Sequence, residues 1–201
     1  LRVAIDSKIQ DVSTCCTEDT LLVHADMAEG FLQRAIKELG EAKVLIRGDE
    51  RVRALPGVNG QVEAATEEDW SAEYLDYVLS VKIVDSLEEA IDHINRFGSA
   101  HTDTIVTEDK AAATRFLQGV DSASVFVNAS TRFADGYRYG LGAEIGISTG
   151  RLHSRGPVGL EGLTTYKYLL EGSGQIVDDY SGSDARPYTH KLLDRQWTRV
   201  S

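Results

Sequence analysis

The sequence predicts an α/β protein with a parallel sheet and βαβ crossovers. Between residues 77 and 127, short apolar runs alternate with amphipathic segments and short links, which is the pattern of consecutive βαβ units. The run 77–84 is apolar at nearly every position, as expected of a strand covered on both faces. The segment after it carries helix boundaries, with Ser86 and Glu89 at capping-box spacing and Gly98 at the end.

The start of the chain contains a short strand pattern and a pair of cysteines. Residues 1–6 alternate like a strand, which suggests that an N-terminal portion of the domain is missing. Residues 13–19 carry hydroxyl and acidic side chains suited to a short helix start. There the helix dipole would lower the pKa of Cys15 or Cys16 and make the thiol nucleophilic. The alternative is that these cysteines are small buried apolar residues.

Between the cysteines and residue 77 the sequence predicts two more strands with a helix between them. The helix has a capping-box start and an apolar stripe. The elements expected here are a strand at 20–24, a helix from Asp26 to Gly40, a strand at 44–46, a surface loop over 49–63 and a solvated helix start at 67–69 before Trp70.

After Gly98 the alternation of strands and helices continues. The elements expected are a strand at 104–106, a helix over 111–119 that carries Phe116 and Leu117, and a strand at 125–127. Ligands of parallel sheets gather at the carboxyl ends of the strands. We expect His101, Asn128 and the segment that follows to lie there.

Residues 125–163 form the most unusual stretch, with a glycine every few residues and arginines between them. Glycine is used this densely where the backbone takes unusual dihedral angles or approaches a ligand. Interspersed tyrosines, leucines and isoleucines argue against disorder. We therefore predict an ordered loop that lines an anion site, with Arg132 and Arg155 as clamps for carboxylate or phosphate. The alternative for each arginine is a solvated surface position.

The C-terminal part divides differently from the rest. Residues 163–170 alternate like a strand, and with little chain left to cover it we expect pairing with another subunit. The tail is polar, with Trp197 as a possible anchor. We therefore predict an α/β domain over 1–160, an oligomerisation strand over 161–178 and a polar tail over 179–201.

Composition limits the partners and the compartment. The 201 residues are 42% hydrophobic and 26% charged, with a formal net charge of -11. This charge argues against nucleic acid or an anionic membrane as the main partner, because both require a basic surface. No apolar run approaches the ~20 residues of a membrane span, and no cysteine or histidine pair has metal-ligand spacing. Adjacent cysteines favour a reducing compartment, so we expect a cytoplasmic protein that has no metal site.

Two segments resemble a known family. Residues 127–168, VNASTRFADGYRYGLGAEIGISTGRLHSRGPVGLEGLTTYKY, and residues 84–105, which include the His101-Thr102-Asp103 triplet, are similar to the gamma-glutamyl phosphate reductase family. These are glutamate-5-semialdehyde dehydrogenases of proline biosynthesis, alone or fused to glutamate kinase, within the aldehyde dehydrogenase superfamily. The resemblance implies an N-terminal NADP-binding Rossmann domain, a catalytic α/β domain and an oligomerisation strand, of which this chain holds the last two.

The same resemblance assigns roles to individual residues. The reactive cysteine of the family precedes a TLLVH-like segment, which gives Cys15. The family pattern usually has proline, asparagine and glutamate where this chain has Val12, Cys16 and Asp19, so Cys16 stays an alternative. Glu73 would reach the nicotinamide ribose. The residues implied to hold the substrate are His101, Asn128, Ser130, Thr131, Arg132 and Arg155.

The function implied is the NADPH-dependent reduction of L-glutamyl 5-phosphate to L-glutamate 5-semialdehyde with release of phosphate, through a cysteine thioester, in a homo-oligomer. A glutamate kinase could be fused to it or bound in a complex. Two alternatives remain at this point. The chain could be a non-catalytic remnant or assembly module of that enzyme, or a cysteine hydrolase that uses Cys15 with His101.

Overall fold

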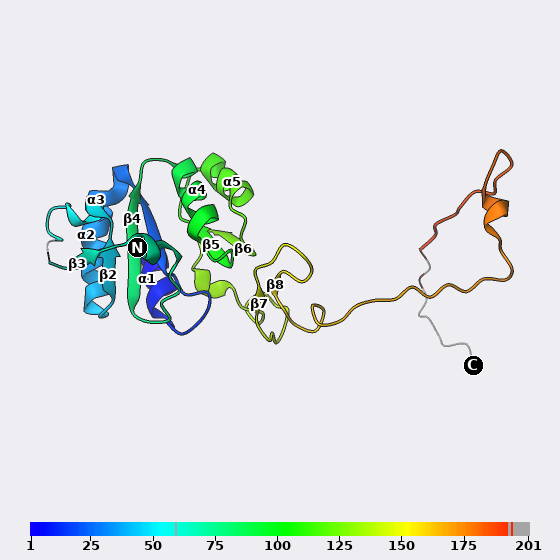
Figure 1. Ribbon diagram of the computed structural model, residues 1–201, viewed down its shortest axis with the longest axis horizontal. Coiled ribbons are helices and arrows are strands. Elements are labelled where there is room, and N and C mark those ends of the chain that lie inside the picture. The colour runs from blue at the N-terminus through cyan, green and yellow to red at the C-terminus, as the bar shows by residue number, and fades with distance from the viewer. Residues whose placement is uncertain (59, 193, 195–201) are drawn as a thin grey trace. The chain divides into compact units, whose positions relative to one another are not determined.

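The computed structural model describes residues 1–58, 60–192 and 194, in two units, Leu1–Thr165 and Tyr166–Ser201. The first unit has the predicted α/β architecture (Figure 1). Trp197 lies outside the described residues, so its expected anchoring role stays untested. No helix in the described part of the chain is both long enough and apolar enough to cross a membrane.

The main sheet has four parallel strands in the order β1 (Thr20–His24), β4 (Val78–Val84), β2 (Leu45–Gly48) and β3 (Val62–Ala64). Strand β4 is central and pairs along its length with β1 and β2. This confirms the expectation from its continuous apolar run, because a strand flanked on both sides and covered on both faces has no solvated face.

Helix α2 (Ala25–Glu41) packs its apolar stripe against this sheet and forms the larger core with it. The helix begins one residue before the expected capping residue, because His24 Nδ1 accepts a hydrogen bond of 3.2 Å from the Asp26 amide and so caps the first turn. Figure 1 shows α2 on the side of β4 away from α4 and α5. The largest fully buried apolar side chains of this core are Leu32, Leu39, Ile46, Val52, Val58, Leu79 and Val81.

Part of the region expected to be a loop is regular structure. Helix α3 (Glu50–Arg53) starts at Asp49, whose Oδ1 accepts from the Val52 amide at 2.8 Å and whose Oδ2 accepts from the Ile83 amide at 3.1 Å. Gly48 allows β2 to pack closely against this region, because a Cβ atom there would lie only 2.7 Å from a methyl group of Val62. The loop prediction was wrong here because a four-residue helix and a three-residue strand give too little periodicity to detect.

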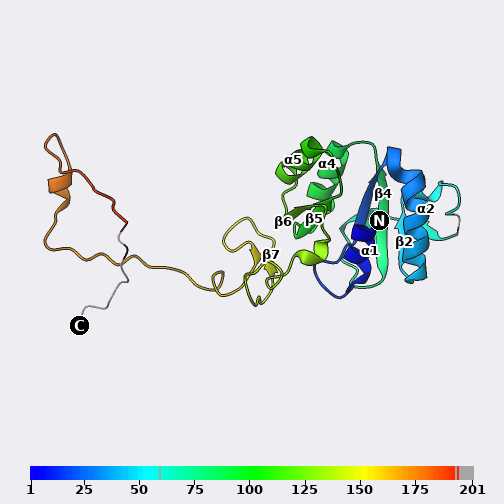
Figure 2. The same cartoon turned by 180° about the vertical axis from the view of Figure 1, so that it is seen from behind.

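A second, two-stranded parallel sheet is formed by β5 (Thr102–Ile105) and β6 (Ser124–Val127). Helices α4 (Leu87–Phe97) and α5 (Lys110–Gly119) lie side by side over these strands (Figure 2). The β5–α5–β6 crossover is as predicted, whereas β4 and β5 belong to separate sheets. The core of this half is formed by Ile91, Phe116 and Val120.

The predicted N-terminal strand is instead helix α1 (Arg2–Ile9). Ile5 and Ile9 pack against the main core, while Ser7 and Lys8 are also buried. The i, i+4 spacing of the two isoleucines is the helical signal in this segment. The strand prediction was wrong because it rested on only six alternating residues. No helix starts at residues 13–19 either, because the cysteines lie in a series of turns between α1 and β1.

The glycine-rich segment contains a short 3-10 helix, η2 (Thr131–Phe133), and an antiparallel pair, β7 (Ile147–Ser148) with β8 (Gly156–Pro157). The ordered loop predicted there therefore has defined structure. Its large apolar side chains are nevertheless exposed in the single chain, with Tyr137, Leu141, Ile145, Leu152 and Leu160 as the members.

The second unit contains one regular element among its described residues, the 3-10 helix η3 (Val177–Tyr180). Residues 163–170 are not a strand in the single chain. The oligomerisation strand expected over 161–178 would form only on pairing with a second copy, and it stays a prediction.

Candidate functional site

The cysteine turn and the start of the glycine-rich segment meet in space. Arg132 Nη1 donates to Cys16 Sγ at 2.5 Å, although the two residues are 116 positions apart in sequence. Cys16 is buried, whereas Cys15 is exposed. The fold therefore brings the predicted nucleophile segment next to the predicted anion-binding arginine. The guanidinium contacts Cys16, not Cys15.

Arg132 is buried and held by several partners. Its Nε donates to Gln10 Oε1 at 2.8 Å, and its backbone amide donates to Ser130 Oγ at 3.3 Å. Its carbonyl oxygen accepts from Arg138 Nη1. The guanidinium has five N–H groups, so these contacts leave donors for an anionic ligand.

Ser130 and Thr131 lie beside Arg132 and are tied to helix α1. Ser7 Oγ donates to Ser130 Oγ at 3.2 Å and accepts from the Thr131 amide at 3.2 Å. Ser130 and Thr131 are both buried, and the Thr131 hydroxyl has no hydrogen-bond partner in the described part of the chain. Three of the predicted substrate residues, Ser130, Thr131 and Arg132, thus lie together next to the cysteine turn.

The electrostatic environment of Cys15 is the opposite of that expected. Partial burial raises the pKa of Cys15, and its electrostatic interactions with Cys16, Glu144 and Glu73 raise it further. The expected lowering of the Cys15 pKa required a helix that begins at residues 13–19, and the structure has turns there. Cys15 is therefore an exposed thiol that is mostly protonated at neutral pH in the single chain. Glu144, whose Oε2 accepts from the Gly136 amide at 2.9 Å, was not assigned to the site from the sequence.

Glu73 and His101 are close enough to interact electrostatically. Burial lowers the pKa of His101, and the charge of Glu73 opposes this effect. His101 Nδ1 bonds to Thr102 Oγ1 at 2.7 Å, while its Nε2 is buried without a partner among the described residues. Neither nitrogen bonds to a cysteine in that part of the chain, which gives no support to a Cys–His hydrolase. Glu73 itself is exposed.

Asn128 and Arg155, the other two predicted substrate residues, are engaged elsewhere. Asn128 has a positive φ of 57° and exchanges two hydrogen bonds with the Thr107 backbone, at 2.9 and 2.8 Å. Arg155 Nη2 donates to Asp121 Oδ1 at 2.9 Å, at the edge of a cavity of about 260 Å³. Both polar atoms of the Asn128 side-chain amide are thus engaged, whereas Arg155 uses only Nη2. The predicted substrate roles of both residues stay untested.

Three ionisable residues lie beside the cysteine turn, with Lys8 buried and Glu18 and Asp19 partly buried. Lys8 is fully buried with Nζ 3.5 Å from Asp19 Oδ1. Burial lowers the pKa of Lys8 and raises that of Asp19, although each charge partly offsets the effect on the other. Burial also raises the pKa of Glu18 to about 8, and its Oε2 is enclosed without a partner among the described residues. A buried lysine leaves no local signal in the sequence.

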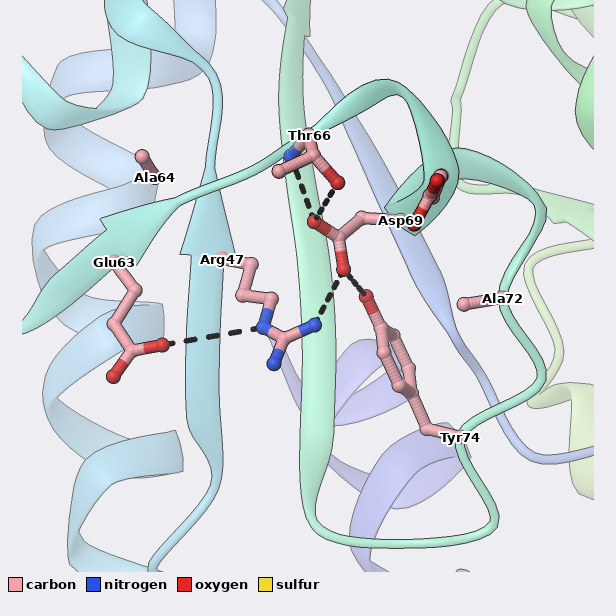
Figure 3. Close-up of a pocket in the computed structure, with 8 residues that line it drawn as sticks. Arg47, Glu63, Ala64, Thr66, Asp69, Ala72 and Tyr74 are labelled. Atoms are coloured by element: carbon pink, nitrogen blue, oxygen red, sulfur yellow. Dashed lines mark hydrogen bonds and ion pairs between the residues drawn. The ribbon is translucent and has the colours of Figure 1, made fainter.

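A second polar cluster fixes the segment that carries Glu73 (Figure 3). Asp69, at the 3-10 helix η1 (Glu67–Ser71), accepts from Arg47 Nη1 at 2.6 Å, from Tyr74 OH at 2.8 Å and from Thr66 at 2.7 and 2.9 Å. Burial would raise the pKa of Asp69, but these hydrogen bonds together lower it well below its usual range. Asp69 is buried, so the expected solvated position was wrong for this residue. The cavity of about 390 Å³ beside it is lined by this cluster together with two glutamates and two alanines.

The structure offers no group of three or more metal-ligating side chains within the residues that it describes. The prediction that the protein uses no metal is not tested by this observation. A polar group near Cys15 is suited to a cofactor. Glu73 is exposed and within electrostatic range of that thiol, which fits a carboxylate that accepts hydrogen bonds from a sugar hydroxyl.

Comparison with known proteins gives consistent relatives, although the chain matches no protein-family model. Gamma-glutamyl phosphate reductase of Natronomonas pharaonis is 55% identical over 196 residues, which cover 98% of this chain and 44% of the relative. The enzyme of the same name from Synechococcus sp. (strain JA-3-3Ab) is 58% identical over 191 residues, or 95% of this chain and 41% of the relative. The chain thus spans less than half the length of these relatives.

The solved structures agree. The crystal structure of gamma-glutamyl phosphate reductase from Thermotoga maritima matches with a TM-score of 0.83 and 45% identity, over 87% of this chain and 42% of that one. An acetylating aldehyde dehydrogenase from Geobacillus thermoglucosidasius matches with a TM-score of 0.58 and 19% identity, over 87% of this chain and 48% of that one. The second similarity concerns the fold alone.

Proposed function

The chain belongs to the gamma-glutamyl phosphate reductase family, of whose members it spans less than half, and we propose that it supplies the thiol that accepts the acyl group in that reaction. The whole reaction is the NADPH-dependent reduction of L-glutamyl 5-phosphate to the semialdehyde, in proline biosynthesis. The observation that carries the proposal is the contact between Arg132 and Cys16, since it puts an anion-binding group beside the cysteine turn.

Cys15 is the nucleophile in this proposal. The thiol loses its proton to water, and the thiolate attacks the acyl carbon. A carbon–sulfur bond forms and the bond from carbon to the phosphate oxygen breaks, so that phosphate leaves with the electron pair. The carbonyl oxygen becomes negative in the transition state and requires hydrogen-bond donors, for which the Cys16 amide is suited. Cys15 is exposed, so an acyl phosphate can reach it.

Arg132 is proposed to bind the phosphate group, with Ser130 and Thr131 beside it. A planar guanidinium suits phosphate because two parallel N–H groups can bind two oxygens. The buried Thr131 hydroxyl without a partner in the described chain supports a polar ligand at this position. His101, Asn128 and Arg155 stay candidates for the glutamyl carboxylate.

A bound NADPH would supply the hydride that converts the thioester to the aldehyde. Glu73 is the candidate to hold its ribose, and the remainder of the cofactor site would come from the part of the relatives that this chain does not span. A homo-oligomer, an association with glutamate kinase and a cytoplasmic location complete the proposal.

The first half of the reaction needs no cofactor, so it tests the proposal on this chain. The chain is incubated with acetyl phosphate, and phosphate release and the intact mass are followed. We expect one acetyl group per chain on a thiol, lost in Cys15→Ser and retained in Cys16→Ser. Acetylation that depends on Cys16 alone would show that the nucleophile is assigned to the wrong cysteine, and no acetylation at all would contradict the catalytic role.

The exposed apolar side chains of the segment 137–160 favour a second candidate, an assembly module of the same enzyme. Single large apolar residues on a surface are normal, but several on one segment mark an interaction site. Dimer formation by sedimentation, together with no acetylation and no NADPH binding by calorimetry, would favour this candidate over the first.

A further inference from the structure

Helix α1 is bonded to both halves of the site. Ser7 and Lys8 at its C-terminal end are polar and yet almost fully buried, at 1% and 0% exposure. The Ser7 carbonyl accepts from the Glu18 amide at 3.0 Å, next to the cysteines, while its hydroxyl bonds to Ser130 and to the Thr131 amide. The end of α1 therefore has a fixed position relative to the cysteine turn and to residues 130–132.

Gln10 follows directly after α1 and bonds to Arg132. Its Oε1 accepts from Arg132 Nε at 2.8 Å, while Arg132 Nη1 donates to Cys16 Sγ at 2.5 Å. Two of the three guanidinium nitrogens are thus held by fixed partners. Because the guanidinium is planar, two such bonds also fix the direction of its remaining N–H groups.

The position of Gln10 indicates a role beyond packing. The residue is exposed, so its side chain fills no part of the core, and its hydrogen bond is its principal contribution to the surroundings of Arg132. An arginine side chain that is free to rotate must lose that freedom when it binds an anion, whereas one held in place has lost it already.

We propose that Gln10 is a positioning residue that holds the Arg132 guanidinium with its remaining N–H groups directed at a phosphate group bound beside Cys15. This inference rests on the proposed function, because it identifies what directs the proposed phosphate-binding arginine. It predicts that loss of the Gln10 acceptor weakens phosphate binding at Arg132 about tenfold without loss of folded structure.

The test is a titration of the full chain with inorganic phosphate, followed by NMR on the Arg132 Nε–H resonance. That resonance is assigned by its absence in Arg132→Lys. Gln10→Met keeps the length of the side chain and removes the acceptor. Gln33→Met is the matched control, because Gln33 also makes one side-chain hydrogen bond, to the Pro56 carbonyl at 2.9 Å, on the exposed side of α2.

We expect saturable phosphate binding in the wild type and in Gln33→Met, and an apparent Kd about tenfold higher in Gln10→Met, with unchanged urea midpoints. The Arg132 Nε–H should also exchange faster with water in Gln10→Met alone. Equal affinity in all three proteins, or no phosphate binding at Arg132 in the wild type, would overturn the inference. The acetyl phosphate experiment decides the thiol chemistry separately, so failure of one is distinguishable from failure of the other.

Discussion

Asp19→Asn is expected to be among the most destabilising single-atom changes in the chain, because Asp19 compensates a fully buried lysine. Lys8 Nζ lies 3.5 Å from Asp19 Oδ1, and the lysine side chain has 0% exposure against 25% for Asp19. Asparagine keeps an oxygen for the Tyr74 amide, which donates to Asp19 Oδ1 at 3.4 Å. The substitution therefore removes the charge and little else.

The size of the effect follows from what Lys8 can do without its partner. Removing one member of a buried ion pair typically costs about 3–5 kcal/mol, because a charge is left unpaired. The lysine can also lose its proton, and from an ordinary pKa of 10.5 this costs at most about 5 kcal/mol at neutral pH. We therefore expect Asp19→Asn to lower the free energy of unfolding by about 3–5 kcal/mol at pH 7.

Lys8→Met is the matched control. It replaces the buried cation with an apolar side chain of similar length and leaves Asp19, which water can reach, so the expected loss is only about 1 kcal/mol. Urea unfolding followed by circular dichroism measures both variants. A larger loss in Lys8→Met than in Asp19→Asn would refute the reasoning.

The pH dependence provides a second check on the same variant. Burial puts the folded-state pKa of Lys8 below its unfolded value, so the unfolded chain binds more protons between the two values and stability rises with pH. Without Asp19 the folded-state pKa falls further. The difference between Asp19→Asn and the wild type should therefore narrow as the pH rises from about 7 towards 10, and a constant difference would contradict this account.

Three further predictions concern neighbouring groups. The rate of Cys15 alkylation by iodoacetamide should rise with pH, with a midpoint above the ordinary thiol pKa of 9.0. Glu73→Gln should lower that midpoint because it removes a negative charge. An unchanged midpoint would exclude an electrostatic interaction between Glu73 and Cys15. Burial holds Glu18 at a pKa of about 8, against an ordinary value of 4.5. Its contribution to stability is therefore complete below pH 4.5 and is lost as the pH rises through 8. In urea unfolding, Glu18→Gln should be more stable than the wild type at alkaline pH but not near pH 4. Asp69→Ala should cost about 3 kcal/mol in the same assay, because Arg47, Thr66 and Tyr74 lose a shared acceptor; a loss below about 1 kcal/mol would show that the cluster is replaceable by water.

Local sequence predicted the elements whose signals are strong and repeated. Strand β4 is predictable because apolar residues run through it without interruption. Helix α4 is predictable because Ser86 and Glu89 have capping-box spacing, and in the structure Ser86 Oγ accepts from the Glu89 amide. Helix α1 is hard to predict because its helical signal is a single pair, Ile5 and Ile9. Ile9 lies outside the six alternating residues that suggested a strand. Short segments carry too few residues to decide between the two periods.

The site was predictable only in part, for a different reason. The order of strands implied that the segment after β6 lies near the ends of the other strands, and the resemblance named Cys15, Ser130, Thr131 and Arg132. Gln10 acts through Arg132, which is 122 positions away, whereas Asp19 matters because its near neighbour Lys8 is buried. Nothing in a polar residue and its immediate neighbours reveals a partner more than a hundred positions away.

Asp19 also connects the two polar clusters, which has a consequence for Glu73. Its Oδ1 lies near Lys8 Nζ and accepts from the Tyr74 amide, while the Tyr74 hydroxyl donates to Asp69. Glu73 is the residue before Tyr74, so its backbone is fixed by Asp19 on one side and by the Asp69 cluster on the other. Asp19 also follows the cysteine turn in sequence, so the residue that holds the Tyr74 amide directly borders that turn. Burial is the main cause of the raised Cys15 pKa and Glu73 adds to it, so a variant that releases Tyr74 should lower the midpoint of Cys15 alkylation by less than Glu73→Gln does, even though it changes no charge near the sulfur.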